Sequence, residues 1–290
     1  MTPDYKKAAS DIIVGYDPGD PAAAAAALEG LWLQAPAKEV GGLTSVDREA
    51  LKAVGVAVSV LTEIGKTLGR AARKQVDDFL PLARRLWKDH GREGRIVAVH
   101  ALGPMELAAP EKVLPVVVEL CRTCQAWEDC DQLAMRALEP IVRQKPEEWL
   151  PAMEALLADE NKWVRRAAIT VIGRLPIKHP TYAHRCVQLA ERLLFDEDAD
   201  VRRGTSFAIR LCAHRQTRPV SDFLARHVPP QNPAASWVLC DAVRSMAKRL
   251  LPEFASLLPL YEQWASDQGL SARDRRSVES AIKTLRSVEA

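Results

Sequence analysis

The sequence has few aromatic residues, 6% of its 290 positions, and no uninterrupted apolar run near the roughly 18 residues that a membrane-spanning helix needs. Its charges nearly cancel, at a formal net charge of +2, which excludes a polyanion mimic and a basic tail protein. The start lacks the charged, apolar and small-residue segments of a secretory signal. We therefore expect a cytoplasmic protein that has no contact with a membrane.

A disulfide framework is also missing. The six cysteines lie inside helical patterns, which fits a reducing compartment; they are Cys121, Cys124, Cys130, Cys186, Cys212 and Cys240. Cys121-x-x-Cys124 with Cys130 nearby leaves a zinc site as an alternative, but no second ligand pair follows at a suitable spacing. We therefore expect no metal and no cofactor.

The sequence does contain a regular repeat of small residues within apolar patterns of helical period. Successive positions are 36, 33, 37, 36 and 37 residues apart: Ala98, Ala134, Ala167, Gly204, Cys240 and Ser277. A period of this length is typical of stacked helical hairpins, because one helix pair cannot bury its apolar face alone. The spacing predicts an all-α array of about six antiparallel helix pairs, whose second helices line a concave face.

We expect two segments: an N-terminal extension over 1–45, with a short helix over 22–33, and a single repeat array over 46–290. A helix starting at Ser45 leads into residues 50–74, and the array proper starts near Pro81. The first helices of the pairs are predicted at 81–90, 111–125, 146–159, 182–195, 221–227 and 252–264. The second helices are predicted at 93–102, 129–142, 162–175, 200–213, 235–250 and 272–287, with Asn161, Asp198 and Ser271 as caps.

Charge is distributed unevenly along the array. Residues 104–160 contain 12 Asp or Glu and 5 Lys or Arg, whereas residues 162–218 contain 5 and 12. The second stretch is where we expect an anionic partner to bind.

Two motifs stand at the start of successive second helices. The first is Trp127-x-x-x-Asp131, and the second is Trp163-x-x-Arg166-Ala-Ala-Ile. At these residues the chain resembles the AlkD-type alkylpurine DNA glycosylases, a bacterial family of HEAT-like repeat proteins. The resemblance covers residues of about 50 to 245 and includes Trp87, Arg92, Glu93 and Arg95 in an earlier repeat and residues 200–210 in a later one.

The resemblance implies a function: excision of purines alkylated at N3 or N7 from duplex DNA, without a deep pocket for a flipped base. Such a base is already cationic, so the remaining barrier is positive charge on the sugar, which a carboxylate opposes. Asp131 matches that catalytic residue, and Trp127, four residues earlier on the same helix face, would contact the lesion or sugar.

The same resemblance implies a basic face that binds DNA phosphates. Arg166 matches the family arginine that holds backbone phosphate near the lesion. Four further arginines are candidates for phosphate contacts along the same face: Arg165, Arg202, Arg203 and Arg210. Phe207 stands where catalytic members place a second tryptophan, and this smaller ring would leave a looser cleft.

Each candidate also has a purely structural interpretation. Asp131 could belong with Glu128 and Asp129 to an acidic first turn that favours the positive end of a helix. Trp127 and Trp163 could be packing residues between repeats. The arginines could form a solvated face paired with the acids at 196–200.

Three functions therefore remain open. The first is an alkylpurine glycosylase acting as a monomer on double-stranded DNA in the bacterial cytoplasm. The second is a non-catalytic relative that binds damaged, bent or branched DNA. The third is a protein-interaction scaffold, whose concave face the acidic stretch over 104–160 would occupy.

Overall fold

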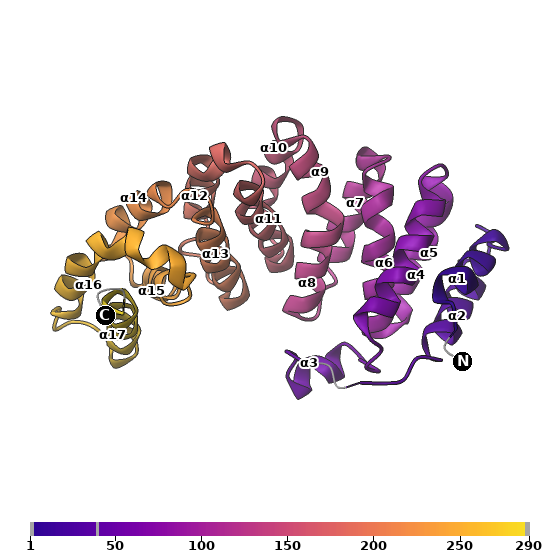
Figure 1. The fold of residues 1–290 in the computed structure, drawn as a ribbon, viewed down its shortest axis with the longest axis horizontal. Helices are drawn as coiled ribbons and strands as arrows, with labels where there is room; N and C mark the ends of the chain where they lie inside the picture. The colour runs from indigo at the N-terminus through magenta and orange to yellow at the C-terminus, as the bar shows by residue number, and fades with distance from the viewer. Residues whose placement is uncertain (1–2, 39–40, 288–290) are drawn as a thin grey trace. The chain divides into compact units, whose positions relative to one another are not determined.

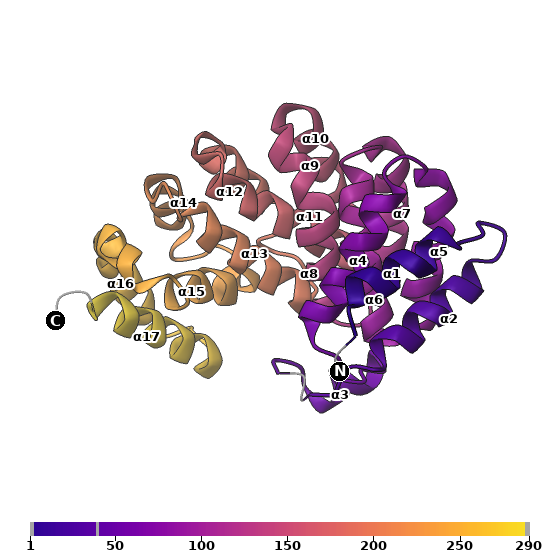
Figure 2. The ribbon, with the colours of Figure 1, turned by 45° about the vertical axis from the view of Figure 1, so that its right-hand side comes forward.

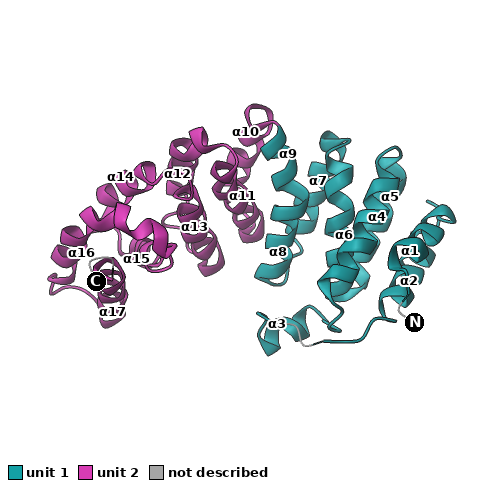
Figure 3. Ribbon diagram, viewed as in Figure 1, with its two compact units in different colours: residues 1–144 teal, residues 145–290 magenta. Residues whose placement is uncertain are grey.

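The computed structural model describes residues 3–38 and 41–287, and within these ranges every regular element is a helix (Figure 1). The prediction of an all-α, HEAT-like repeat fold is confirmed. The chain forms two compact units, unit 1 over residues 1–144 and unit 2 over residues 145–290 (Figure 3). The predicted boundary at residue 45 stays a prediction, and residues 1–2, 39–40 and 288–290 of the predicted segments lie outside the described ranges.

Unit 1 contains nine α-helices and a π-helical turn within its described residues. They are α1 (Tyr5–Val14), α2 (Pro21–Trp32), α3 (Ser45–Ala50), α4 (Val58–Ala72), α5 (Val76–Asp89), α6 (Gly91–Glu106), α7 (Pro110–Cys121), α8 (Trp127–Leu133), the π turn η1 (Ala134–Leu138) and α9 (Glu139–Gln144). The helix expected over 22–33 is α2, whereas α1 is a second helix in the N-terminal segment. Both pack within unit 1, α1 against α4 and α2 against α5.

Unit 2 combines α-helices with short 3₁₀ helices. They are α10 (Pro146–Leu156), α11 (Lys162–Arg174), η2 (Leu175–Ile177), η3 (Pro180–Tyr182), α12 (Ala183–Glu191), α13 (Ala199–Cys212), α14 (Arg218–His227), η4 (Pro233–Ala235), α15 (Ser236–Arg244), η5 (Lys248–Leu257), α16 (Leu258–Ala265) and α17 (Ala272–Arg286). Figure 2 shows α12, α14 and α16 following one another on one side, with α13, α15 and α17 on the other.

Helices are present at all six predicted pairs. Five pairs pack together: α5 with α6, α7 with α8, α10 with α11, α12 with α13, and η5–α16 with α17; α14, which precedes α15, packs on α12, α13 and η5. We use the name inner layer for α4 and the second helices α6 and α8–α9 in unit 1, and for the second helices α11, α13, α15 and α17 in unit 2. Helices of this layer pack directly on one another within each unit.

The inner layer is held together by close backbone contacts at glycine. A Cβ atom on Gly69 of α4 would lie 2.4 Å from the carbonyl oxygen of Ala101 in α6, and one on Gly173 of α11 would lie 2.4 Å from the Cα of Ala208 in α13. No side chain fits at such distances, so the small residues found in the sequence repeat reflect helices that touch through their backbones.

The predicted N-terminal caps are confirmed. Asn161 accepts a hydrogen bond from the Trp163 amide at the start of α11, and Asp198 accepts from the amides of Asp200 and Val201 at the start of α13. Ser271 accepts from the Asp274 amide at the start of α17. These side chains satisfy amide groups that have no partner inside the helix.

The predicted helix over 45–74 is wrong, because the chain leaves helical geometry between α3 and α4. Gly55 has a φ of +97°, which glycine tolerates, and its amide and those of its two neighbours donate to the carboxylate of Glu93 in α6. This contact, between residues far apart in the sequence, replaces the hydrogen bonds that a continuous helix would make.

Three further predicted boundaries are corrected by the positions of prolines. Pro81 lies inside α5, which begins at Val76, because a proline one turn into a helix removes only one hydrogen bond. The helix predicted over 129–142 contains the π turn η1 before Pro140. The helix predicted over 235–250 ends at Arg244, and Pro252 lies in the 3₁₀ helix η5 that follows.

Within the described residues, every helix is too short or too polar to cross a membrane.

Replacing Gly69 by alanine tests the glycine contacts. We expect Gly69→Ala to lower the free energy of unfolding by about 1–3 kcal/mol, because the added methyl group meets backbone atoms that cannot move independently. The matched control is Gly30→Ala in α2, where a Cβ meets no atom within 4 Å, and there we expect a gain of about 0.5–1 kcal/mol. Urea unfolding of both variants checks this, and a stabilised Gly69→Ala would contradict the close packing of α4 on α6.

Candidate active site

Trp127 and Asp131 lie on one face of α8, in unit 1. Trp127 is the first residue of this helix and Asp131 follows one turn later, a spacing that places side chains next to each other. Trp127 is 40% exposed, the most exposed of the seven tryptophans, and Asp131 is half-buried. The exposure of Trp127 argues against a role purely in packing between repeats, whereas Trp163 in α11 is buried at 8% exposure.

The two acids next to Asp131 are both engaged by arginines of α6. Arg92 donates two hydrogen bonds of 2.8 Å to the carboxylate of Glu128. Arg95 forms an ion pair with Asp129, which is 3% exposed. The first turn of α8 therefore has two acids, both paired with arginines of the neighbouring inner helix, and Asp131 lies one turn later.

Neighbouring side chains and a backbone amide contact the Arg95–Asp129 pair. The guanidinium carbon of Arg95 lies 5.2 Å from the ring centroid of Trp87, and Trp87 itself donates to the Thr123 hydroxyl at 2.8 Å. Asp129 also accepts from the Gln125 amide at 3.1 Å. Burial raises the pKa of Asp129, and the positive charge of Arg95 partly offsets that rise. The pair fixes the start of α8 and with it the direction of Trp127 and Asp131.

A π turn follows Asp131 directly. In η1 the Glu139 amide donates to the carbonyl of Ala134, five residues back. Pro140 has no N–H to give to the Arg136 carbonyl, and that carbonyl instead packs against Gly103 of α6, where a Cβ would lie 2.4 Å away. Isolated π turns of this kind are frequent at functional sites.

In unit 2, Arg165 and Arg202 occupy equivalent positions in the first turns of α11 and α13. Each donates hydrogen bonds to two backbone carbonyls in the loop before its own helix. Arg165 donates to the carbonyls of Asp159 and Glu160, and Arg202 donates to those of residues 196 and 197. Arg165 also forms a bidentate pair with Asp196. These two guanidiniums thus clamp the loops between helices, a role that the sequence reading did not assign to them.

Arg166 lies in the interior of unit 2. Only 7% of it is exposed, and its guanidinium donates to the carbonyl of Asp200 at 2.7 Å. Gly204 of α13 makes room for it, since a Cβ there would lie 3.4 Å from the Cγ of Arg166. The small residue at this repeat position therefore accommodates an arginine as well as a helix contact.

Arg203, Phe207 and Arg210 follow one another along α13. Arg203 forms a 2.9 Å pair with Asp200, but its side chain is 62% exposed, so this pair holds it weakly. The guanidinium carbon of Arg210 lies 5.5 Å from the ring centroid of Phe207. Burial lowers the pKa of Arg210, and Asp241 partly offsets that effect.

The candidate residues thus form two sets. Trp127 and Asp131 share a helix face in unit 1, and the arginines with Phe207 lie at the starts and along the lengths of α11 and α13 in unit 2. Within the described parts of both units, no group of three or more His, Cys, Asp or Glu residues is arranged to hold a metal ion. All six cysteines are buried and unbridged.

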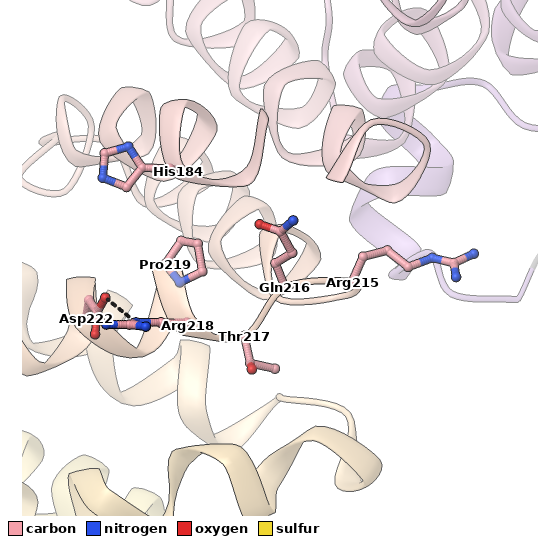
Figure 4. A pocket seen from close by; sticks show the side chains of 7 residues that line it. All are labelled: His184, Arg215, Gln216, Thr217, Arg218, Pro219 and Asp222. Atoms are coloured by element: carbon pink, nitrogen blue, oxygen red, sulfur yellow. Dashed lines mark ion pairs between the residues drawn. The ribbon is translucent and has the colours of Figure 1, made fainter. Parts of the chain in front are cut away.

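A hollow in unit 2 is separate from these residues. It measures about 490 Å³ and is lined by His184 and the segment 215–219 with Asp222 (Figure 4). Figure 4 shows Arg215 and Arg218 extending in opposite directions, and Arg218 lies 3.7 Å from Asp222. Its cationic side chains do not converge on a common point, so we assign it no ligand.

Sequence reasoning missed Arg92 and Arg95 as the partners of the acidic turn. A signal was available, because Glu128 and Asp129 follow these arginines by 36 and 34 residues, one repeat period. In a stacked array, residues one period apart on successive helices are neighbours. A search for opposite charges at that spacing would have identified both pairs.

A family model and several solved structures of repeat proteins match the chain. Residues 33–246 match the model of a family described as DNA alkylation repair enzyme, which covers more than half of the chain. Among solved structures, the HEAT-like repeats protein from the archaeon Thermococcus onnurineus is 14% identical, with 81% of this chain and 99% of that chain covered and a TM-score of 0.35. A designed armadillo repeat protein is 14% identical, with 78% and 94% covered and the same TM-score. Structural similarity this low adds nothing about function, and no curated protein matched.

Removing Arg95 tests its part in fixing α8. We expect Arg95→Met to lower the free energy of unfolding by about 3–5 kcal/mol, because it leaves the Asp129 carboxylate buried without its cation. The matched control is Arg84→Met, which breaks an exposed pair with Glu119 and should cost at most about 1 kcal/mol. Urea unfolding measures both changes, and equal losses would show that the buried pair has no special role.

Proposed function

The chain belongs to the DNA alkylation repair enzyme family, and on that premise we propose that it is a DNA glycosylase for purines alkylated at N3 or N7. The observation that carries the proposal is that Asp131 and the exposed Trp127 share one face of α8. Glu128 and Asp129, the two acids that precede Asp131, are bound by arginines of α6.

The proposed reaction is hydrolysis of the bond between C1′ of deoxyribose and the purine nitrogen. An alkylated purine is cationic and departs as a neutral base when it takes the bonding electrons, so no proton needs to be donated to it. Water adds to C1′ and loses a proton. Positive charge builds up on the sugar in between, and a fixed carboxylate beside C1′ stabilises it and can orient the water.

Trp127 supports the lesion side of this proposal. A cation within about 6 Å of an indole face is attracted by the ring, and the 40% exposure of Trp127 leaves much of the ring open to a ligand. An exposed ring beside a carboxylate can contact a base that stays in or near the base stack of the duplex, so a deep pocket is not required.

The arginines of unit 2 are proposed to hold the DNA backbone. Arg203 and Arg210 are the best placed, because Arg203 is largely exposed and Arg210 donates to two neutral carbonyls, those of Ser206 and Ser245, at 3.4 and 3.3 Å. Arg166 is proposed to hold backbone phosphate near the lesion, the role that its motif suggests. Arg165 and Arg202 would contribute positive potential to the same region while their guanidiniums clamp loops.

The finer details are proposals of the same kind. The partner is double-stranded DNA that contains alkylated purines, and the protein acts as a monomer in the bacterial cytoplasm. Six buried thiols without disulfides are consistent with a reducing compartment.

A second candidate function is damage recognition without base release. Phe207 favours it, because it stands where catalytic relatives place a second tryptophan. A scaffold that binds other proteins is a third possibility. Duplex DNA binding that weakens with salt, without release of any base, would favour the second candidate, and absence of DNA binding at low salt would favour the third.

Asp131→Asn tests the catalytic proposal. Duplex DNA that contains 7-methylguanine should yield abasic sites with the wild-type protein, and we expect the variant to be slower by a factor on the order of 10² or more, since a fixed electrostatic partner of the transition state is lost. DNA affinity should be retained, because the substitution removes a negative charge. Glu119→Gln, an exposed acid on α7, is the control and should keep full activity. A wild type that is no faster than Asp131→Asn excludes this enzyme function.

Phe207→Trp tests the departure from the family pattern. We expect base release to rise about two- to fivefold, since the larger ring adds about 0.5–1 kcal/mol of attraction for a cationic base. Phe195→Trp, at a second exposed position in unit 2, should leave the rate unchanged. A slower Phe207→Trp enzyme would show that the site is built around the smaller ring.

A further inference from the structure

The acid excess of residues 104–160 does not make the inner layer of unit 1 acidic. Glu106 is fully buried, Glu128 and Asp129 are bound by Arg92 and Arg95, and Glu139 is 9% exposed and paired with Arg143. Apart from Asp131, these acids of the second helices are therefore buried or paired with arginines. The charge that this layer presents to a ligand then depends on its exposed cations.

Exposed cations of the inner layer of unit 1 that have no acidic partner are Lys66 and Arg70 of α4 and Arg136 of η1. The side chains of Arg92, Arg95 and Arg143 all have acidic partners. Among the residues that the structure describes, neither Lys66 nor Arg136 has a side-chain hydrogen bond or ion pair, and both side chains are exposed. Unpaired cations on a functional face are available to an anion.

The fold brings Lys66 and Arg136 to either side of His100 in α6. Lys66 lies one turn after Thr62, whose hydroxyl is 3.0 Å from the Nε2 atom of His100. The backbone carbonyl of Arg136 packs against Gly103, which follows His100 by one turn of α6. Because α6 packs on both α4 and η1, Lys66, His100 and Arg136 form one row across three helices.

The centre of this row is neutral. Burial, together with the positive charges of Arg136 and Lys66, lowers the pKa of His100 to about 4. At neutral pH the row therefore has two positive charges, neither of them in an ion pair among the described residues, with an uncharged imidazole between them. An anion placed at the row would relieve the repulsion between the two cations.

We propose that Lys66 and Arg136 bind a backbone phosphate of the DNA, so that unit 1 holds the nucleic acid as well as carrying Asp131. This inference rests on the proposed function and extends it to residues outside the family motifs. A phosphodiester fits because it is an anion and the two cations lie on helices that are held against each other. Gly65 and Gly69 of α4 contact the backbone of α6, and Gly103 of α6 contacts the backbone of η1. Arg136 also follows Asp131 by five residues on the same helical segment, a rise of about 7–8 Å.

The test is DNA binding as a function of salt. Fluorescence anisotropy with an undamaged duplex is measured over a range of salt concentrations for the wild type, Lys66→Gln, Arg136→Gln and the double variant. The slope of log affinity against log salt should fall by about 0.9 for each lost contact, because each neutralised phosphate releases condensed counterions. The charge-conserving variant Lys66→Arg should keep the wild-type slope.

The matched control is Lys88→Gln. Lys88 is an exposed cation of α5 that has no side-chain partner in the described part of the chain, and α5 is not in the inner layer. Its slope should equal that of the wild type. Slopes and affinities of Lys66→Gln and Arg136→Gln that also equal the wild type overturn the proposal.

Base release separates this proposal from the proposed function. With the protein in saturating excess over 7-methylguanine duplex, the wild type should release the base and the control Lys88→Gln should keep the wild-type rate. If the wild type binds DNA with the expected slope but releases no base, the glycosylase proposal fails and the phosphate contact stands. If the wild type binds no duplex DNA at low salt, both fail.

Discussion

Two ion pairs between successive inner helices determine what the candidate site can do. Arg92 with Glu128 and Arg95 with Asp129 join α6 to the first turn of α8, and both pairs are largely shielded from water. If these acids were free, the start of α8 would be a diffuse acidic patch that repels DNA. Since they are bound, the acid of α8 that lies on the face of Trp127 is Asp131, one turn further along the helix.

The same pairs connect the site to the rest of unit 1. Glu93, between the two arginines, accepts hydrogen bonds from the backbone amides of residues 54–56 and so holds the segment after α3. Leu43 and Leu51 of that region form a small buried cluster with Ala126, the residue before Trp127. The first turn of α6 therefore positions both the α3 segment and the start of α8. We infer that a rigid support of this kind keeps Asp131 in place.

The sequence predicted what depends on local pattern and on the repeat. The period gave the six helix pairs, the caps Asn161, Asp198 and Ser271 were identified from their residue type, and the spacing of Trp127 and Asp131 placed both on one helix face. It could not predict features that arise from contacts between helices. The break after α3 depends on Glu93, and the π turn forms where Pro140 lacks an N–H. Similarly, the glycine contacts and the engagement of Arg165 and Arg202 by loop carbonyls follow from close packing that no local pattern encodes.

The central claim is that Asp131 stabilises positive charge on a sugar, and it can be tested without a chemical step. Duplex DNA that contains a protonated pyrrolidine in place of one deoxyribose mimics the charged sugar, and a neutral tetrahydrofuran is its uncharged counterpart. The account predicts that the wild type binds the pyrrolidine duplex more tightly and that Asp131→Asn loses this preference. A preference that is absent in the wild type, or that persists without the carboxylate, would contradict it.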